Sequence, residues 1–222
     1  MTHNAGVASL SVTCPEGRQR HRPTGASAEE MLNAALSTLV SDLPWYAVRR
    51  EFWTPLSHER ADLALISPTE MIGIEIKAAT DRLTRLPRQM AAYDRVFTYC
   101  YAIVDERHAD AALHATPDHW SVLTGTKTGD CVELLELRPA QRNDNYDPES
   151  LVRLLWKDEA AEVLNQLGRP VNASSARSDM WDTLLNTLEP STLAEVVADT
   201  LYSRNPATTS FSQRAAARRA HA

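Results

Sequence analysis

Glycine is scarce in this sequence of 222 residues: it occurs 7 times, and none of these glycines lies between Gly25 and Gly73. Nucleotide-binding folds of the Rossmann and P-loop types need closely spaced glycines in the turn that holds the phosphates, as in GxGxxG and GxxxxGK[ST]. The sequence contains neither pattern. It therefore predicts a protein outside both of these nucleotide-binding classes.

Cysteine, basic charge and long apolar runs are limited as well. The 3 cysteines are scattered and form no CxxC pair, so we expect neither a disulfide framework nor a zinc site, and a cytoplasmic location. The most apolar run, residues 96–104, is shorter than the roughly 18 residues that a membrane-spanning helix needs, and no membrane partner is expected. With 23 basic and 29 acidic side chains the net charge is −6, so any nucleic-acid site must be a local patch.

Hydrophobic periodicity predicts an α/β core. Ser27 and Glu30 form a capping-box pattern at the start of an amphipathic helix that should end near Pro44. Short apolar or alternating runs then predict strands over residues 46–54, 61–66, 71–78, 96–104, 120–123 and 131–137, and helices over residues 85–93 and 108–114. A turn is expected at residues 125–129. This order predicts a mixed sheet flanked by helices.

The last third of the chain is expected to be helical. Asp147-Pro148 is an N-cap pattern for a helix that should run to Gly168, and two more helices are expected over residues 176–188 and 191–204. The predicted organisation is a flexible tail (1–25), an α/β core (26–140), a helical C-terminal extension (141–204) and a second flexible tail (205–222). The acidic residues of the extension favour a structural cap or a surface for a protein partner or a homodimer over a helix-turn-helix DNA reader.

Two neighbouring strands carry charges where a buried sheet normally excludes them. Alternation along residues 71–78 places the isoleucines on one face and Glu75 and Lys77 on the other, and the short turn at residues 67–70 brings Asp62 beside them. Two carboxylates around an open position suit Mg²⁺ or Mn²⁺ and phosphodiester hydrolysis, with Lys77 stabilising the developing charge. A cross-strand ion pair on a solvated face is the alternative for Glu75 and Lys77.

These residues carry a family resemblance. Asp62 followed by Glu75-Ile76-Lys77 resembles the D…ExK signature of the PD-(D/E)XK superfamily of nucleases, which has the restriction-endonuclease-like fold. The segment QMAAY, from Gln89 to Tyr93, resembles the QxxxY element of the exonuclease-like branches of that superfamily. More narrowly, residues 51–164, with the runs RADLALI, GIEIKAATDRLTRLPRQMAAYDRVF and NYDPESLVRLLWKDE, look like a small bacterial and phage family of uncharacterised nuclease-like proteins.

The resemblance implies a metal-dependent nuclease in which Asp62 and Glu75 bind the ion, Lys77 is the catalytic lysine, and Gln89 and Tyr93 face the site. Ala61 stands where the superfamily has the proline of its name, a change that leaves the chemistry intact. The expected function is Mg²⁺- or Mn²⁺-dependent hydrolysis of phosphodiester bonds in DNA. The alternative, favoured by the acidic net charge, is a catalytically silent nuclease-like module that binds nucleic acid or a protein partner. Whether the nucleic acid is single-stranded or double-stranded stays open at this stage.

Several further residues are candidates with ordinary alternatives. Glu30 and Glu51 are candidate metal ligands; Glu30 could instead serve only the capping box, and Glu51 could be a solvent-facing strand charge. For Gln89 and Tyr93, which share a helix face, the alternative is simple packing of an aromatic ring with an amide. Three arginines are predicted to contact DNA phosphates, with a solvated basic helix face as the alternative: Arg82, Arg85 and Arg88.

Overall fold

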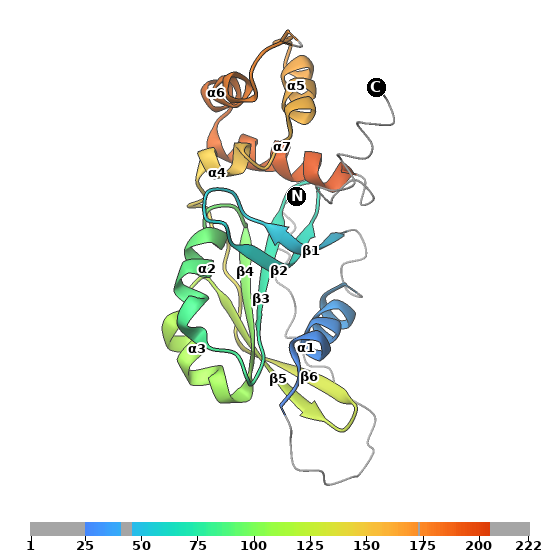
Figure 1. The fold of residues 1–222 in the computed structure, drawn as a ribbon, viewed down its shortest axis with the longest axis vertical. Coiled ribbons are helices and arrows are strands. Elements are labelled where there is room, and N and C mark those ends of the chain that lie inside the picture. The colour runs from blue at the N-terminus through green and yellow to red at the C-terminus, as the bar shows by residue number, and fades with distance from the viewer. Residues whose placement is uncertain (1–24, 41–45, 173, 205–222) are drawn as a thin grey trace.

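The computed structural model describes residues 25–40, 46–172 and 174–204. Six strands form one mixed sheet in the order of the sequence (Figure 1). The β1–β2, β2–β3 and β5–β6 pairs are antiparallel, whereas β3–β4 and β4–β5 are parallel. The strands are β1 (Ala47–Trp53), β2 (Arg60–Ile66), β3 (Met71–Lys77), β4 (Tyr99–Asp105), β5 (Ser121–Thr128) and β6 (Cys131–Arg138). The predicted α/β fold with a mixed sheet is thus confirmed, whereas the two predicted tails lie, except for Gly25, outside the described residues.

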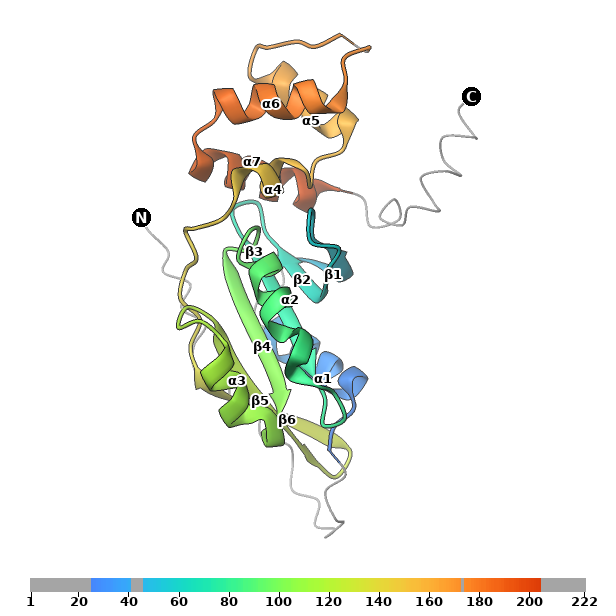
Figure 2. The same cartoon turned by 60° about the vertical axis from the view of Figure 1, so that its left-hand side comes forward.

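Helices cover both faces of the sheet. The helix α1 (Ala28–Ala35) lies against one face, and α2 (Leu86–Tyr93) and α3 (Ala109–Ala115) lie against the other (Figures 1 and 2). The capping box predicted at Ser27 and Glu30 is present and begins α1, which continues as a π-helical turn over Leu36–Val40. The predicted helix end near Pro44 lies outside the described residues. On the α1 face, β2 and β3 contribute five buried apolar residues to one hydrophobic cluster: Leu63, Leu65, Ile72, Ile74 and Ile76.

Three predicted boundaries are wrong, each because of a backbone contact. Residues 96–98 are not part of β4, because the chain is still turning after α2 and the amides of Val96 and Phe97 both donate to the carbonyl of Tyr93 (3.0 and 2.9 Å). The turn predicted at residues 125–129 is shorter, because β5 stays paired with β6 as far as Thr128. The helix predicted from Pro148 to Gly168 is two helices, because Glu159 accepts from the amide of Trp156 (2.7 Å) and starts a new helix there.

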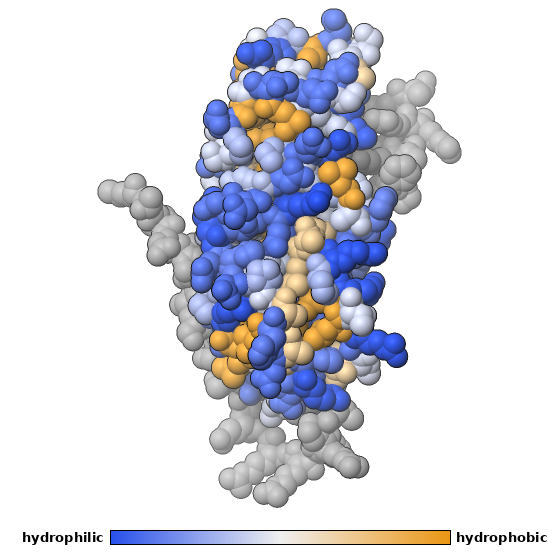
Figure 3. All heavy atoms as spheres, turned by 90° about the vertical axis from the view of Figure 1, so that its left-hand side faces the viewer, coloured by the Kyte–Doolittle hydropathy of each residue, from blue (hydrophilic) through white to orange (hydrophobic). Residues whose placement is uncertain are grey.

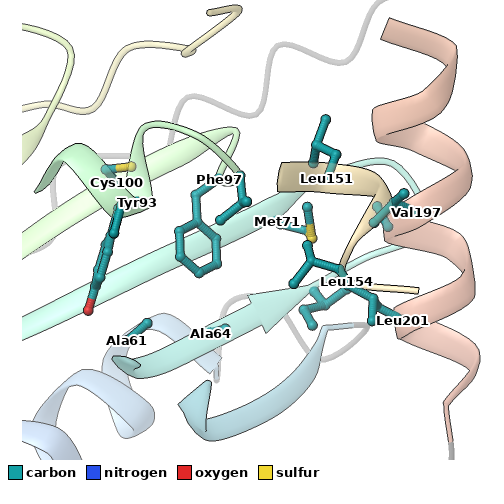
Figure 4. Close-up of a cluster of buried hydrophobic side chains, with 14 of the residues drawn as sticks. Ala61, Ala64, Met71, Tyr93, Phe97, Cys100, Leu151, Leu154, Val197 and Leu201 are labelled. Atoms are coloured by element: carbon teal, nitrogen blue, oxygen red, sulfur yellow. The ribbon is translucent and has the colours of Figure 1, made fainter. Parts of the chain in front are cut away.

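Four C-terminal helices gather at one end of the sheet (Figure 2): α4 (Pro148–Val152), α5 (Lys157–Gln166), α6 (Arg177–Thr187) and α7 (Pro190–Ser203). Buried side chains of α7 and of the segment around α4 share one hydrophobic cluster with Met71 and Phe97, as Figure 4 shows for Leu151, Leu154 and Val197. The last described residue, Arg204, fixes this arrangement. Its guanidinium donates to both oxygens of Glu159 (2.8 and 2.7 Å), and its carbonyl accepts from Arg49 of β1 (2.8 Å). No helix of the described part is long and apolar enough to cross a bilayer.

Candidate active site

The register of β2 and β3 sets Asp62 opposite Glu75. Leu63 pairs with Ile74 and Ala64 with Gly73, so the next step of this antiparallel ladder joins positions 62 and 75. There the amide of Ile76 donates to the side-chain carboxylate of Asp62 (2.7 Å). The carboxylate of Asp62 is therefore held at the junction of the two strands, beside the backbone that follows Glu75.

The α2 side of β3 leaves room for polar groups. Gly73 lies against the ring of Phe97, and a Cβ at this position would overlap that ring. The glycine therefore permits the chain after α2 to approach the sheet closely. Beyond it, Glu75 and Lys77 are 1% and 4% exposed, so two ionisable side chains are buried between the sheet and α2.

Glu75 is bound through both of its carboxylate oxygens. The ammonium of Lys77 donates to Oε1, and the hydroxyl of Tyr93 donates to Oε2 (2.5 Å). The Tyr93 ring is fully buried and lies beside Phe97 (Figure 4), with ring centroids 5.3 Å apart. The ring of Trp120 stacks on it with centroids 5.5 Å apart. The same hydroxyl lies 3.2 Å from the carbonyl of Arg60. The end of α2 thus fixes the position of Glu75 and of the start of β2.

The environment of Asp62 favours its protonated form. The pKa of Asp62 is raised to about 7, mainly by burial and next by the neighbouring Glu75 carboxylate, while the Ile76 amide and Lys77 act in the opposite direction. Like charges at close range disfavour ionisation, and a cation placed between them would relieve that repulsion. The electrostatics therefore make the space beside Asp62 and Glu75 attractive to a positive ion.

The donor atoms fit a hard divalent ion. Two carboxylates with water completing the shell are a common arrangement for Mg²⁺, and each carboxylate oxygen can accept a second contact beyond its present hydrogen bond. One helical turn before Tyr93, the side-chain oxygen of Gln89 is buried without a hydrogen-bond partner among the described residues. Those residues contain no group of three or more His, Cys, Asp or Glu side chains arranged around one point. The fit therefore rests on Asp62 and Glu75 alone.

Glu51 lies next to this group, on its solvent side. In the β1–β2 ladder it falls opposite Asp62, between the pairs Arg50–Leu63 and Phe52–Ala61, and its φ of 49° is in the left-handed region. Its side chain is 67% exposed, and one of its oxygens is 3.9 Å from the guanidinium of Arg60. The carboxylate of Glu51 is near enough to raise the pKa of Asp62 slightly but does not join the buried group.

Glu30 is not brought to the site. Its Oε1 accepts from Lys127 (2.6 Å) and its Oε2 accepts from the amide of Ser27 (2.9 Å), so both oxygens have partners. The hydrogen bond from Lys127 is the main reason that the pKa of Glu30 is lowered to about 2. Because α1 covers the opposite face of the sheet, Glu30 serves the capping box and the contact with β5, and the prediction of Glu30 as a metal ligand is corrected.

The three predicted DNA-binding arginines fall into two groups. Arg82 precedes a short 3₁₀ turn (Leu83–Arg85) and Arg85 ends it; both are exposed and form no ion pair with any described residue. Arg88, in contrast, donates to Glu59, whose side chain is only 6% exposed. The sequence did not predict that Glu59 would bind Arg88, because a single acidic residue in the loop before β2 belongs to no periodic pattern.

Comparisons with known proteins place the chain in a family. None of the curated proteins matches it. A solved structure with a similar chain trace is the SPO1766 protein of unknown function from Silicibacter pomeroyi. Its TM-score is 0.42, and its sequence identity is 15% over 68% of this chain and 98% of that chain. A similarity at this level carries no argument about function. The resemblance to the PD-(D/E)XK superfamily stays a prediction. The family model described as bacteriophage P4 protein cII matches residues 45–222, which include Asp62, Glu75 and Lys77, and the chain belongs to this phage protein family.

Proposed function

We propose that the protein is a nuclease that hydrolyses phosphodiester bonds in DNA with Mg²⁺ or Mn²⁺. The observation that carries the proposal is the convergence of Asp62, Glu75 and Lys77 on the α2 side of the sheet, with Glu75 and Lys77 buried. Removing charges from water is costly, and well-packed apolar residues would commonly give equal or greater stability at such positions. A cluster of this kind is therefore better explained by chemistry than by folding.

The roles follow from the contacts. Asp62 and Glu75 would hold the ion, which when bound polarises a phosphate oxygen and acidifies a water. Lys77 has an ammonium that can donate to the attacking water and to the negative charge that grows on phosphorus. Tyr93 keeps one oxygen of Glu75 in place, so the other remains directed to Lys77. The buried side-chain oxygen of Gln89, which has no hydrogen-bond partner among the described residues, would accept a hydrogen bond from a water or a substrate group that enters the site.

DNA would reach this group over the α2 face. Most of that face is hydrophilic, with smaller apolar patches (Figure 3). Arg82 and Arg85 are exposed and unpaired among the described residues, and guanidinium groups bind phosphate oxygens through two parallel hydrogen bonds. Because the chain as a whole carries a net charge of −6, this local basic region is the expected contact for the DNA backbone.

The test is cleavage with defined metals. Circular and linear DNA, single- and double-stranded, would be incubated with the protein in Mg²⁺, Mn²⁺ or EDTA, beside the variant Asp62→Ala. We expect cleavage only with a divalent metal and only by the wild type. Mn²⁺ should also raise the melting temperature of the wild type and of a Glu30→Gln control, but not that of Asp62→Ala. An equal rise in Asp62→Ala would mean that the ion binds elsewhere.

A second function, binding without cleavage, is favoured by one observation. The buried carboxylate of Glu75 already has a partner on each oxygen, Lys77 and Tyr93, so the group is compensated within the protein. In that case the wild type would bind DNA and leave it intact with either metal. Lys77→Met would then change no activity, because there would be no cleavage to lose.

A further inference from the structure

The β1–β2 hairpin, next to the candidate active site, has a strained but firmly held backbone. Every non-glycine residue with positive φ in the described part of the chain lies in this hairpin: Glu51 (49°), Leu56 (67°) and His58 (58°). Residues other than glycine rarely adopt the left-handed backbone region, and those that do are concentrated at functional sites.

Buried contacts keep the loop of the hairpin in this conformation. The amide and the hydroxyl of Thr54 both donate to the carbonyl of Glu59 (3.0 and 2.8 Å), and both residues are buried. The carboxylate of Glu59 in turn binds Arg88 of α2. The loop is therefore tied to the same helix that carries Gln89 and Tyr93, and its surface groups are presented in a fixed position.

The hairpin exposes large apolar side chains beside basic ones. Trp53 is 48% exposed and Leu56 is 49% exposed, although large apolar residues elsewhere in the sheet are mostly buried. In the ladder Trp53 pairs with Arg60, whose side chain is 64% exposed. An exposed indole and an exposed guanidinium thus lie opposite each other on neighbouring strands.

This pair is close to the candidate catalytic group and is connected to it. Arg60 precedes Asp62 on β2 by two positions, a distance of roughly 7 Å along a strand. The carbonyl of Arg60 lies 3.2 Å from the hydroxyl of Tyr93, which also holds Glu75. One tyrosine therefore links the backbone of the Trp53–Arg60 pair to the proposed metal-binding carboxylate.

We propose that Trp53 and Arg60 form a platform for an unpaired nucleotide, so that the substrate of the site is DNA with a single-stranded segment. An indole face stacks on a base of any sequence, and a neighbouring guanidinium binds the phosphate. Bases inside an intact duplex are covered by their neighbours and are not accessible to such a platform. The inference names the substrate of the site and therefore rests on the proposed nuclease function.

Binding measured without cleavage tests the platform. In EDTA, the affinity of the full-length protein for a labelled single strand and for a blunt duplex of equal length would be compared by fluorescence anisotropy. Trp53→Ala should weaken single-strand binding about tenfold and change duplex binding less than about twofold. Trp53→Phe keeps a ring that can stack and should restore most of the affinity. Leu135→Ala removes another exposed apolar side chain, on the edge strand β6, and should change neither.

The outcomes separate this inference from the proposed function. If Trp53→Ala binds single-stranded DNA as tightly as the wild type, the platform proposal is wrong. This would also be the result if the exposed indole binds a protein instead of a nucleotide. An equal loss for both DNA forms, or no rescue by Trp53→Phe, would overturn it too. If Trp53-dependent single-strand binding is found but no metal allows cleavage, the nuclease proposal fails and the binding platform stands. If cleavage is found and prefers blunt duplex, the nuclease proposal stands and the platform fails.

Discussion

The two faces of β3 have opposite chemistry within one strand of 7 residues. On the α1 side, Ile72, Ile74 and Ile76 belong to an apolar cluster that includes Leu63 of β2. On the α2 side, Met71 joins the other apolar cluster at the start of the strand, and Gly73, Glu75 and Lys77 follow it. Both sides are buried, so burial alone does not explain why one is apolar and the other charged. A pair of charged side chains in so buried a place is what the proposed active site would require.

The isoleucines and the charged residues of β3 also differ in how much they contribute to the free energy of unfolding. Full burial of an isoleucine contributes about 1.5–3 kcal/mol. A buried ion pair contributes little net stability, because desolvation offsets the attraction, and apolar replacements of similar volume are often neutral or stabilising by about 1–4 kcal/mol. The isoleucines of β3 therefore stabilise the fold, whereas Glu75 and Lys77 add little net stability at their positions. The following variants test this division of roles.

The largest effect is expected at Lys77. Lys77→Met should lower the cleavage rate by about a hundredfold or more, because the ammonium near the reacting phosphate is lost. It should also lower stability by about 3 kcal/mol, since Glu75 stays buried without its cation. Cleavage assays and urea unfolding would measure the two effects.

Matched variants separate chemistry from folding at this position. Lys77→Arg keeps the charge but not the shape of the ammonium, so it should lose cleavage with a smaller loss of stability. Ile76→Val, on the other side of the strand, should cost about 1 kcal/mol of stability and leave cleavage intact. Wild-type cleavage by Lys77→Met would show that the charged side has only a structural role.

The second-largest effect is expected for Asp62→Asn, which should gain stability relative to the wild type as the pH rises. The folded protein keeps a proton on Asp62 up to a pKa of about 7, whereas the unfolded chain releases it near a pKa of about 4. Wild-type stability therefore falls as pH rises between these values, by at most about 1.4 kcal/mol per pH unit. Asp62→Asn lacks this loss, so in EDTA its advantage in urea unfolding should grow from about pH 4 to about pH 7 and then stay constant.

Glu30→Gln is a control variant in which the expected change in stability has the opposite sign. Lys127 holds the pKa of Glu30 at about 2, below its value in the unfolded chain. This carboxylate contributes stability at neutral pH that is lost progressively as the pH falls from the unfolded pKa of about 4 to below about 2. Glu30→Gln should therefore be less stable than the wild type at about pH 8, where Asp62→Asn should be more stable. A loss of stability in Asp62→Asn across this pH range would identify Asp62 as a structural residue.

The local part of this arrangement could be predicted from the sequence. The α/β order, and the approach of Asp62 to Glu75, depend on strand alternation and on one short turn, both visible in the sequence. The pairing of Glu59 with Arg88, of Glu30 with Lys127 and of Arg204 with Glu159 depends on how distant elements pack. Single charges in loops and at helix ends carry no periodic signal, so these contacts could not be predicted.

A smaller effect distinguishes Arg85 from Arg88, two of the arginines on the proposed DNA-binding side of the molecule. Arg85→Ala should weaken DNA binding and reduce the slope of its salt dependence by about one counterion, because it removes an exposed arginine that has no ion-pair partner among the described residues. Arg88→Ala should affect DNA binding less but lower stability by about 1 kcal/mol, because it leaves the buried carboxylate of Glu59 without its cation. Titrations at several salt concentrations, with thermal melts, would show the difference. Equal salt slopes for the two variants would contradict the distinction.

The smallest effect is expected at Gln89, and it concerns stability in the absence of ligand. The side-chain oxygen of Gln89 is buried without a partner in the described part of the protein, which costs free energy that Met, of similar size, would not incur. Gln89→Met should therefore leave stability unchanged or raise it by about 1 kcal/mol while cleavage falls. Met90→Leu, a volume-conserving change at the next position, should leave cleavage at the wild-type level. If Gln89→Met destabilises the protein and leaves cleavage unchanged, the side chain of Gln89 stabilises the fold and is not part of the active site.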